Sequence, residues 1–330
     1  MIKVKLSFPY PEWDLIRQTP ASKGIWKDYK FYINESITEC DYWFVFDHLL
    51  TNTENTICAK ENTVLLTAEP FSIQGYDQKF TNQFGHIITC QEEIKHPKLT
   101  RFLQGHPWFV GAEYREGKYQ KFSKGYDELI NTVLVNKTKQ ISIITSDKLI
   151  TDGHKKRYEF ALALKDYFGS NIDLFGRGVH DFADKWDVLA DYKYSIAIEN
   201  SCYPDYVSEK IMDCYLAHTF PIYHGSPNIG HYFSTQAFQS IDILKIDNAK
   251  RSIEQLLNDP NHYSNALPEL LKAKNKCLNE YNLFPLIVNF IEQKLKANNR
   301  KKANITLKST FLPTIKDKIV NKIKSLKFEF

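Results

Sequence analysis

The sequence predicts an α/β protein of two domains, and three observations support this class. The chain has 330 residues, of which 43% are hydrophobic, so it can bury large cores and favours two domains over one. The stretch Thr63 to Thr67 is largely apolar, as in a parallel strand covered on both faces. Farther on, the strand pattern Tyr194 to Ile198, a helical pattern and the strand pattern Phe220 to Tyr223 follow one another. We predict domains over 1–138 and 139–300, followed by a basic amphipathic tail over 301–330.

In the N-terminal part, strand patterns are expected over Ile2 to Leu6, Tyr42 to Phe46 and Ile87 to Cys90. The strand Thr63 to Thr67 ends in Ala68-Glu69-Pro70. Ligands of open α/β sheets bind outside the carboxyl ends of the strands, so Glu69 is placed where chemistry is expected. A carboxylate near an apolar cleft can accept a proton from a hydroxyl group, whereas a loop glutamate that simply faces water is the alternative.

The second domain begins with the strand pattern Ile141 to Ser146. Asp152-Gly153 precedes a helical pattern, and the strand pattern Ile172 to Gly176 completes a βαβ unit. Arg157 lies early in this helix, and its planar guanidinium suits phosphate oxygens. A solvated basic face formed with Lys155 and Lys156 is the alternative.

The most informative polar stretch follows the strand Tyr194 to Ile198. Glu199-Asn200-Ser201 comes first, and Ser208 then fits a helix N-cap, with Glu209 and Lys210 in the first turn. A lysine at this end of a helix opposes the helix dipole, so an anion in front of it would explain Lys210. Glu209 could accept hydrogen bonds from vicinal hydroxyls, as acidic residues do for a ribose. A solvated surface pair remains the alternative for Glu209 and Lys210.

The same stretch resembles the donor-binding signature of the α-1,3-fucosyltransferases, glycosyltransferase family 10. That signature reads approximately F-E-N-S, then D/G-Y-V-T-E-K, then P-V/I-x-x-G-x-P. The matching residues here are Ile198-Glu199-Asn200-Ser201, Asp205-Tyr206-Val207-Ser208-Glu209-Lys210 and Pro221-Ile222-Tyr223-His224-Gly225-Ser226-Pro227. Ile198 stands in place of an aromatic residue and Ser208 in place of a threonine. An ordered match of this length is far more specific than a lone glycine motif.

The resemblance implies a GT-B-like fold of two facing Rossmann-like domains, with the acceptor on the first and the nucleotide sugar on the second. It implies inverting transfer of fucose from GDP-β-L-fucose to a hydroxyl of an N-acetylglucosamine or glucose unit of a glycan, in α-1,3 or α-1,4 linkage, as in surface polysaccharide or lipopolysaccharide synthesis. A transferase of the same fold that uses another nucleotide sugar, or a sugar-binding module without turnover, are the alternatives.

The resemblance also implies a role for each matching residue. Glu69 would be the general base, and Glu199 would steady the positive charge that develops on the sugar ring. The donor would be held by Arg157, Asn200, Ser201, Tyr206, Ser208, Glu209 and Lys210. Arg157, Lys210 and the helix N-terminus at Ser208 would neutralise the charge on the departing diphosphate. No DxD-like pair follows a strand, so we expect no metal cofactor.

Composition restricts location and partners. No apolar run approaches the roughly 20 residues that span a bilayer, and the first residues do not fit a signal peptide, so we expect a cytoplasmic protein. The six cysteines show no metal-finger spacing. From Lys294 to Phe330 there are eleven Lys and Arg residues and two acidic residues, a net charge of +9. Because the whole chain has a net charge of +4, the preceding residues have a net charge of −5. Nucleic acid is therefore not expected as a partner of the folded body.

The tail repeats Phe311, Ile315, Ile319 and Ile323 every four residues, with lysines at other positions. This pattern is typical of a basic amphipathic helix on an anionic membrane surface, which would place the protein peripherally at an inner membrane. A helix docked on the body and a nucleic-acid arm are the alternatives.

Overall fold

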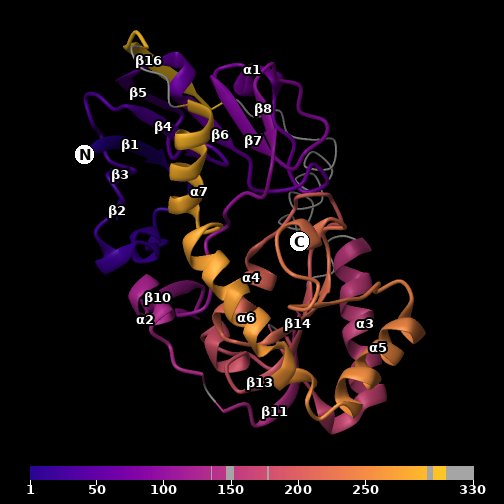
Figure 1. Ribbon diagram of the computed structural model, residues 1–330. Helices are drawn as coiled ribbons and strands as arrows, with labels where there is room; N and C mark the ends of the chain where they lie inside the picture. Colours follow the sequence, from indigo (N-terminus) through magenta and orange to yellow (C-terminus); the bar gives the residue numbers. More distant parts are fainter. Residues whose placement is uncertain (135, 146–151, 177, 296–299, 310–330) are drawn as a thin grey trace. The chain divides into compact units, whose positions relative to one another are not determined.

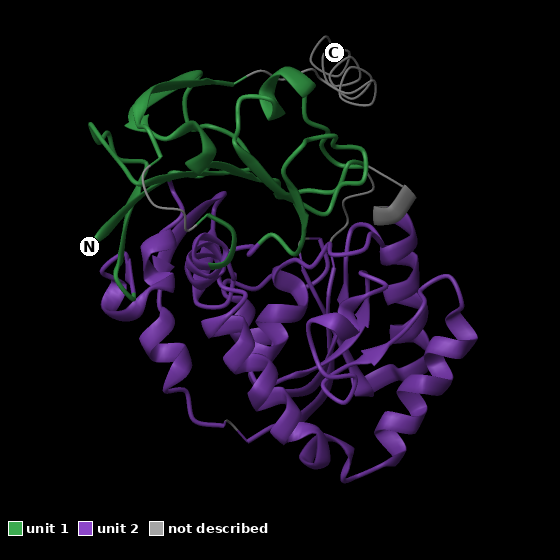
Figure 2. Ribbon diagram, turned by 45° about the horizontal axis from the view of Figure 1, so that its top comes forward, with its two compact units in different colours: residues 1–11, 27–104, 293–330 green, residues 12–26, 105–292 purple. Residues whose placement is uncertain are grey.

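The computed structural model describes residues 1–134, 136–145, 152–176, 178–295 and 300–309. The chain forms two compact units, coloured separately in Figure 2: unit 1 comprises 1–11, 27–104 and 293–330, and unit 2 comprises 12–26 and 105–292. These bounds differ from the consecutive domains expected from the sequence, because 12–26 and 105–138 pack within unit 2. Arg17 shows why, since its buried guanidinium donates to the carbonyl oxygens of Trp108 and Val110 at 2.6 and 3.0 Å.

Unit 1 contains a parallel sheet in the order β3-β1-β4-β6-β7-β8. Its strands are β1 (Ile2–Ser7), β3 (Tyr29–Ile33), β4 (Tyr42–Phe46), β6 (Thr63–Leu66), β7 (His86–Thr89) and β8 (Leu99–Arg101), and α1 (Gln78–Thr81) precedes β7. All four residues of β6 are buried, as the apolar pattern of this stretch predicted. The strands expected over 2–6, 42–46, 63–67 and 87–90 are thus confirmed, with ends shifted by one residue at most.

Unit 2 contains a second parallel sheet in the order β12-β11-β13-β14-β15. Its strands are β11 (Lys139–Ile144), β12 (Ile172–Phe175), β13 (Tyr192–Ile198), β14 (Phe220–His224) and β15 (Gln239–Ser240). Six of the seven residues of β13 are buried, which fits a strand covered on both faces. Helix α3 (Asp152–Phe168) packs on β12, and α4 (Glu209–Leu216) packs on β13 and β14. The predicted alternation of strands and helices is therefore confirmed.

The carboxyl ends of four strands meet at one edge of this sheet. Ile144 pairs with Phe175, and Ile198 pairs with His224, so the residues that follow these strands lie near one another. Gly176, directly after β12, has a φ of 128°, and a Cβ there would lie 1.6 Å from the carbonyl oxygen of Thr145. Only glycine permits this close approach of two loops at the sheet edge.

Most of the remaining elements of unit 2 are labelled in Figure 1. The helices are α2 (Tyr126–Ile130), α5 (Ile246–Asn258), α6 (His262–Asn279) and α7 (Leu283–Phe290), and the other strands are β2 (Ile25–Trp26), β9 (Ala112–Arg115) and β10 (Lys118–Phe122). Strands β9 and β10 form an antiparallel hairpin. Both strands are short and partly exposed, so their sequence alternation is weak.

In the tail, β16 (Ala303–Lys308) pairs antiparallel with β5 (Thr53–Cys58) over its whole length. The first part of the predicted tail is therefore a strand of unit 1. The amphipathic helix expected around Phe311 to Ile323 lies outside the described residues. Among the residues that are described, no helix combines the length and the apolar character needed to cross a membrane.

Candidate functional site

The N-terminus of α4 is built by the polar residues that follow β13. Ser208 is the N-cap, and its hydroxyl accepts a hydrogen bond from the backbone N–H of Lys210. Glu209 and Lys210 form the first turn, as the sequence pattern predicted. A serine with extended backbone geometry satisfies one of the free N–H groups at this end, so the helix begins at a defined residue.

Glu199 is the buried anchor of this turn. Its side chain is 0% exposed. One carboxylate oxygen accepts from the Ser208 N–H at 2.9 Å, and the other accepts from the Ser208 hydroxyl at 2.6 Å and lies 3.3 Å from Lys210 Nζ. A carboxylate with so many donors holds the loop and the lysine in one arrangement. The geometry thus gives Glu199 a positioning role, and its predicted contact with the sugar ring stays a prediction.

Gly225, from the third block of the signature, lies against the Glu199 carboxylate, where there is no room for a side chain. A Cβ at Gly225 would lie 2.5 Å from Glu199 Cγ and 2.3 Å from the Tyr223 hydroxyl oxygen. That same hydroxyl is 3.4 Å from Glu199 Oε1. A side chain at this position would displace Glu199 and the helix turn that it holds.

Arg157 reaches the same edge from α3. Its Nη1 donates to the Asn200 side-chain oxygen at 2.9 Å, which joins two residues that the signature and the preceding βαβ unit suggested separately. The Nε of Arg157 is buried and has no hydrogen-bond partner among the described residues. Burial lowers the pKa of the guanidinium, and the charges of Glu199 and Glu209 oppose that shift. A buried donor left over in this way is typical of a site completed by an anionic ligand.

Lys185 joins Glu209 to a carboxylate one turn farther along α4. Its ammonium is 3.2 Å from Glu209 Oε1 and 2.9 Å from Asp213 Oδ2, and its side chain is 16% exposed. Asp213 also accepts from the backbone N–H groups of Phe109 and Val110 at 2.9 and 3.3 Å. Helix α4 is therefore tied to the segment that leads into the β9–β10 hairpin.

The charges in this network stabilise the ionised carboxylate of Glu209. Burial by itself raises the pKa of Glu209, but the nearby ammonium groups of Lys210 and Lys185 overcome this and hold it well below the ordinary value of 4.5. Burial raises the pKa of Asp213, opposed by Lys185 and reinforced by the charge of Glu209. Burial by itself lowers the pKa of Lys185, but the carboxylates of Asp213 and Glu209 raise it above its ordinary value.

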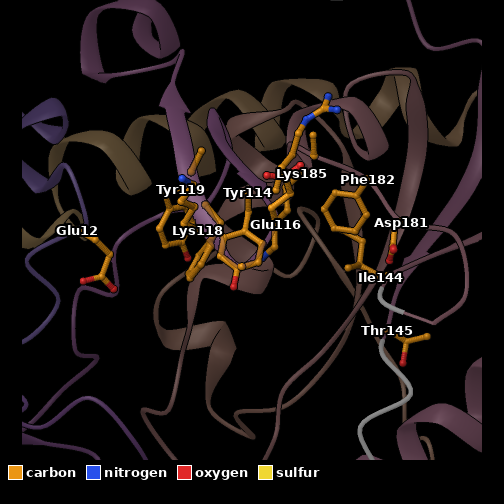
Figure 3. Close-up of a pocket in the computed structure, with 16 residues that line it drawn as sticks. Glu12, Tyr114, Glu116, Lys118, Tyr119, Ile144, Thr145, Asp181, Phe182 and Lys185 are labelled. Carbon is orange, nitrogen blue, oxygen red and sulfur yellow. The ribbon is translucent and has the colours of Figure 1, made fainter.

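Two cavities open at this edge of the sheet. The small cavity, of about 210 Å³, is lined by Arg157, Lys210, Glu209 and Lys185 together with residues of β13. The large cavity, of about 1190 Å³, is lined by the β9–β10 hairpin and by the segment after β12 (Figure 3). Ile144, Thr145 and Lys185 line both cavities, so the two meet at these residues.

The other predicted donor-site residues lie on the loop between β13 and α4. Tyr206 is buried, and its ring packs edge-on against His106 with centroids 6.2 Å apart. Asn200 and Ser201 are half-buried. The loop is held by Asn228, which accepts from the Asp205 N–H at 2.8 Å and donates to the Asp205 carboxylate at 2.7 Å. Asp205 has a φ of 63°, a conformation that aspartate tolerates better than most residues.

Glu69 lies in unit 1, after β6, as its sequence position predicted. The backbone of its loop is held by Gln91, whose side-chain amide donates to the carbonyl oxygens of Glu69 and Gln74 at 2.6 and 2.7 Å. Nearby, the buried Asp47 carboxylate after β4 accepts hydrogen bonds from the Tyr76 hydroxyl and from Gln74. The carboxyl edge of the unit 1 sheet thus carries polar groups, and the role of Glu69 as a base stays a prediction.

Sequence reasoning missed Lys185, Asp213 and the aromatic residues of the large cavity. Asp213 had a local signal, because it lies four residues after Glu209 and hence on the same helix face. Lys185 had no local signal in the sequence, because it lies in a short 3₁₀ helix 24 residues before Glu209. Its partners depend on how distant segments pack.

Residues 134–267 match the family described as glycosyltransferase family 10 (fucosyltransferase), C-terminal. An α-(1,3)-fucosyltransferase of Helicobacter pylori is 35% identical over 91 residues, which is 27% of this chain and 19% of that protein. An α-(1,3)-fucosyltransferase B of Drosophila melanogaster is 49% identical over 41 residues, 12% of this chain and 9% of that protein. The chain thus spans less than a fifth of the length of these two relatives.

Solved structures with the same fold extend the likeness beyond this domain. A crystal structure of an α1,3-fucosyltransferase with GDP has a TM-score of 0.52 and 21% identity, covering 91% of each chain. An α-glucosyltransferase in complex with UDP and DNA has a TM-score of 0.53 at 7% identity, covering 88% of this chain and 99% of the other. At these identities the likeness shows the fold, which is GT-B-like with two parallel sheets.

Proposed function

We propose that the chain transfers L-fucose from GDP-β-L-fucose to a glycan, because residues 134–267 match the family described as glycosyltransferase family 10 (fucosyltransferase), C-terminal. The acceptor is a hydroxyl of an N-acetylglucosamine or glucose unit in a surface polysaccharide or lipopolysaccharide, the linkage is α-1,3 or α-1,4, and the anomeric configuration inverts. The observation that carries the proposal is the convergence of Arg157, Glu209 and Lys210 on one small cavity. Two α1,3-fucosyltransferase crystal structures with this fold hold GDP and GDP-fucose, which supports the choice of donor.

The diphosphate of the donor is assigned to the small cavity. Arg157 has a buried Nε without a partner among the described residues, and Lys210 stands in the first turn of α4, where free N–H groups and the helix dipole favour an anion. Glu199 holds Lys210 in place from beneath. The positive groups therefore exist before the donor binds and need little rearrangement when negative charge develops.

Glu209 is assigned to the ribose. Its carboxylate is kept ionised by Lys185 and Lys210, so it can accept hydrogen bonds from two vicinal hydroxyls. It lines the cavity that Arg157 and Lys210 also line. This order places the phosphates and the ribose of one nucleotide along the N-terminus of α4.

The chemical step breaks the bond between the anomeric carbon and the diphosphate oxygen, and the acceptor oxygen forms the new bond from the opposite face. The electron pair of the broken bond goes to GDP, where Arg157 and Lys210 stabilise it. The proton of the acceptor hydroxyl goes to the Glu69 carboxylate. Tyr206, Asn200 and Ser201 shape the loop beside the donor.

The direct test is an incubation of the protein with GDP- and UDP-sugars and a mixed panel of glycan acceptors, followed by detection of nucleotide release and product. GDP release from GDP-fucose that depends on an acceptor is the expected result. Turnover with a UDP-sugar but not with GDP-fucose would instead show that the chain is a transferase of the same fold that uses another donor. Binding of sugars without any release would leave only a sugar-binding module.

We further propose that side chains alone neutralise the diphosphate, without a metal ion. The three cations Arg157, Lys185 and Lys210 line the small cavity and can supply that charge. The initial rate in EDTA should therefore stay within about twofold of the rate with Mn²⁺. A complete loss of activity in EDTA that Mn²⁺ restores would contradict this proposal.

A further inference from the structure

Two cysteines of unit 1, Cys40 and Cys58, are brought together by the backbone just ahead of them. Glu39 and Ile57 form a parallel bridge. In it, the Ile57 N–H donates to the Thr38 carbonyl oxygen at 2.9 Å, and the Cys40 N–H donates to the Ile57 carbonyl oxygen at 3.0 Å. One residue farther along both segments, Cys40 lies opposite Cys58. Neighbouring strands are roughly 4.8 Å apart and a disulfide needs Cα atoms about 4.4–6.8 Å apart, so the backbone already has a suitable spacing.

The two thiol groups are in contact inside unit 1. Both residues are 0% exposed, and the Cys58 Sγ lies 3.9 Å from the Asp41 carbonyl oxygen. A hydrogen bond between the thiols lowers the pKa of Cys40 against the effect of burial, and Thr56 and Lys5 add to this lowering. The same hydrogen bond raises the pKa of Cys58, and burial raises it further. Cys40 is therefore the thiol that ionises first, which is the property of the attacking sulfur in a redox pair.

The pair lies in a buried apolar cluster that β16 helps to close. Ala303 of β16 pairs with Cys58, and Leu307 of β16 packs in the cluster that contains both cysteines. A bulky disulfide reagent therefore has poor access to the thiols. Hydrogen peroxide is little larger than water, so it can reach positions that such a reagent cannot. The chemistry that suits this pair is oxidation by a small peroxide.

We propose that Cys40 and Cys58 are a reversible oxidation site that a peroxide converts into a disulfide. The Cys40 thiolate attacks one oxygen of hydrogen peroxide, the O–O bond breaks, and the hydroxide that leaves takes up the proton lost by Cys40 to become water. Cys40 is then a sulfenic acid. The Cys58 sulfur attacks the Cys40 sulfur, the S–S bond forms, and the sulfenic hydroxyl leaves with the Cys58 proton as a second water. Two electrons thus pass from the two sulfurs to the peroxide, and neither step involves the donor or the acceptor of the proposed transfer.

The test exposes the folded full chain to hydrogen peroxide, alkylates the remaining thiols in denaturant and maps all cysteines by peptide mass spectrometry. Of the six thiols, Cys40 and Cys58 should be lost together in one linked peptide, and dithiothreitol should restore both. Cys40→Ala and Cys58→Ala should each abolish the linked peptide. Cys90→Ala, at another buried cysteine of unit 1, is the matched control and should keep it. Oxidation of the exposed Cys202 alone, with Cys40 and Cys58 both alkylated, would overturn the proposal.

Urea unfolding of the same samples tests whether the link fits the native fold. The link closes a loop of roughly 18 residues, which in the chain-entropy model favours the folded state by roughly a hundredfold. The oxidised chain should therefore unfold at a higher urea concentration than the reduced chain, and Cys90→Ala should show the same shift. A linked chain that unfolds at a lower urea concentration would mean that the disulfide distorts the fold, which contradicts a pairing already present in the folded protein.

Discussion

At the scale of the residue, Arg157 has a buried donor that the described residues leave unpaired. One of its terminal nitrogens is paired with Asn200 at 2.9 Å, while its buried Nε has no partner among the described residues. From the sequence, the alternative to a donor contact was a solvated basic face formed by Arg157 with Lys155 and Lys156. Lys155 is 65% exposed and lies 3.8 Å from Glu159, so it belongs to a solvated helix face, whereas Arg157 points into the cavity region.

Arg157→Lys should raise the KM for the donor by roughly 10- to 150-fold, because a lysine cannot reproduce the planar fork and charge-assisted hydrogen bonds are worth about 1.5–3 kcal/mol. Initial-rate kinetics with GDP-fucose measure this change. Lys155→Met is the matched control on the same helix and should stay within about twofold of wild type. Equal effects of the two substitutions would mean that Arg157 makes no specific contact with the donor.

Glu69→Gln should lower kcat by about 10²–10⁴-fold, because the amide cannot accept the acceptor's proton. GDP affinity, measured by calorimetry, should not change, since the residues assigned to GDP all lie in unit 2. Glu61→Gln, an exposed carboxylate of unit 1, is the control. A variant with a near-normal rate would remove Glu69 as the base and direct attention to another group of unit 1.

At the scale of the element, α4 is held by charges on both of its first two turns. Glu209 and Asp213 share Lys185, and Asp213 also accepts from the backbone of Phe109 and Val110. The helix is therefore coupled to the segment that leads into the β9–β10 hairpin. The residues that line the two cavities are therefore held in a common geometry through Asp213.

Lys185→Met should lower the free energy of unfolding by about 3–5 kcal/mol, because it leaves two carboxylates buried without their shared cation. Urea unfolding measures this loss, and adding Asp213→Asn should restore part of it. Restoration is expected because the asparagine removes the buried charge of Asp213, which has lost its cation, whereas Glu209 still has Lys210 at 3.6 Å. No recovery in the double variant would mean that Lys185 acts through packing, for instance through its ammonium 4.9 Å from the Phe109 ring centre.

The pH dependence of the stability difference between wild type and Lys185→Met follows from the pKa of Glu209. In wild type this pKa lies below its ordinary value of 4.5, so its stabilising contribution is fully present above that pH and is lost as the pH falls through the folded value. Without Lys185, Lys210 remains 3.6 Å from Glu209 and still lowers its pKa, but by less than the two cations together, so the stabilising contribution is smaller in the variant. The stability difference between wild type and Lys185→Met should therefore be largest near neutral pH and shrink on acidification, and a constant difference would contradict this account.

At the scale of the whole molecule, the C-terminal region has two parts. Residues Ala303–Lys308 pair with β5, and the Ser309 N–H donates to the Asn52 carbonyl oxygen at 2.9 Å. The amphipathic pattern begins after this point. A test of membrane binding should therefore remove residues 310–330 and keep β16.

The full chain should sediment with vesicles that contain anionic lipid, and a chain ending at Ser309 should stay in solution. Each lysine near an anionic surface contributes about 1 kcal/mol, so high salt or neutral lipid should release the full chain. Equal partitioning of the two proteins would contradict a membrane role for the tail. A chain ending at Asn298 would be a poor comparison, because it loses β16 and exposes β5.

The sequence by itself determined the strands, their polar ends and the turn from Ser208 to Lys210. Side-chain period, capping and strand ends are local properties, and the family signature lies entirely within residues 198–227. The same information placed Arg157 and Glu199 near the donor residues, since consecutive parallel strands bring their carboxyl ends to one edge.

Only the tertiary structure decided what each of these residues touches. It showed Glu199 buried beneath the helix turn, Lys185 between two carboxylates of α4, and Tyr114 beside the segment that carries Asp181 and Phe182. It also moved 12–26 and 105–138 into the second unit. These contacts join segments tens of residues apart, and their geometry depends on how whole elements pack, which no local pattern in the chain encodes.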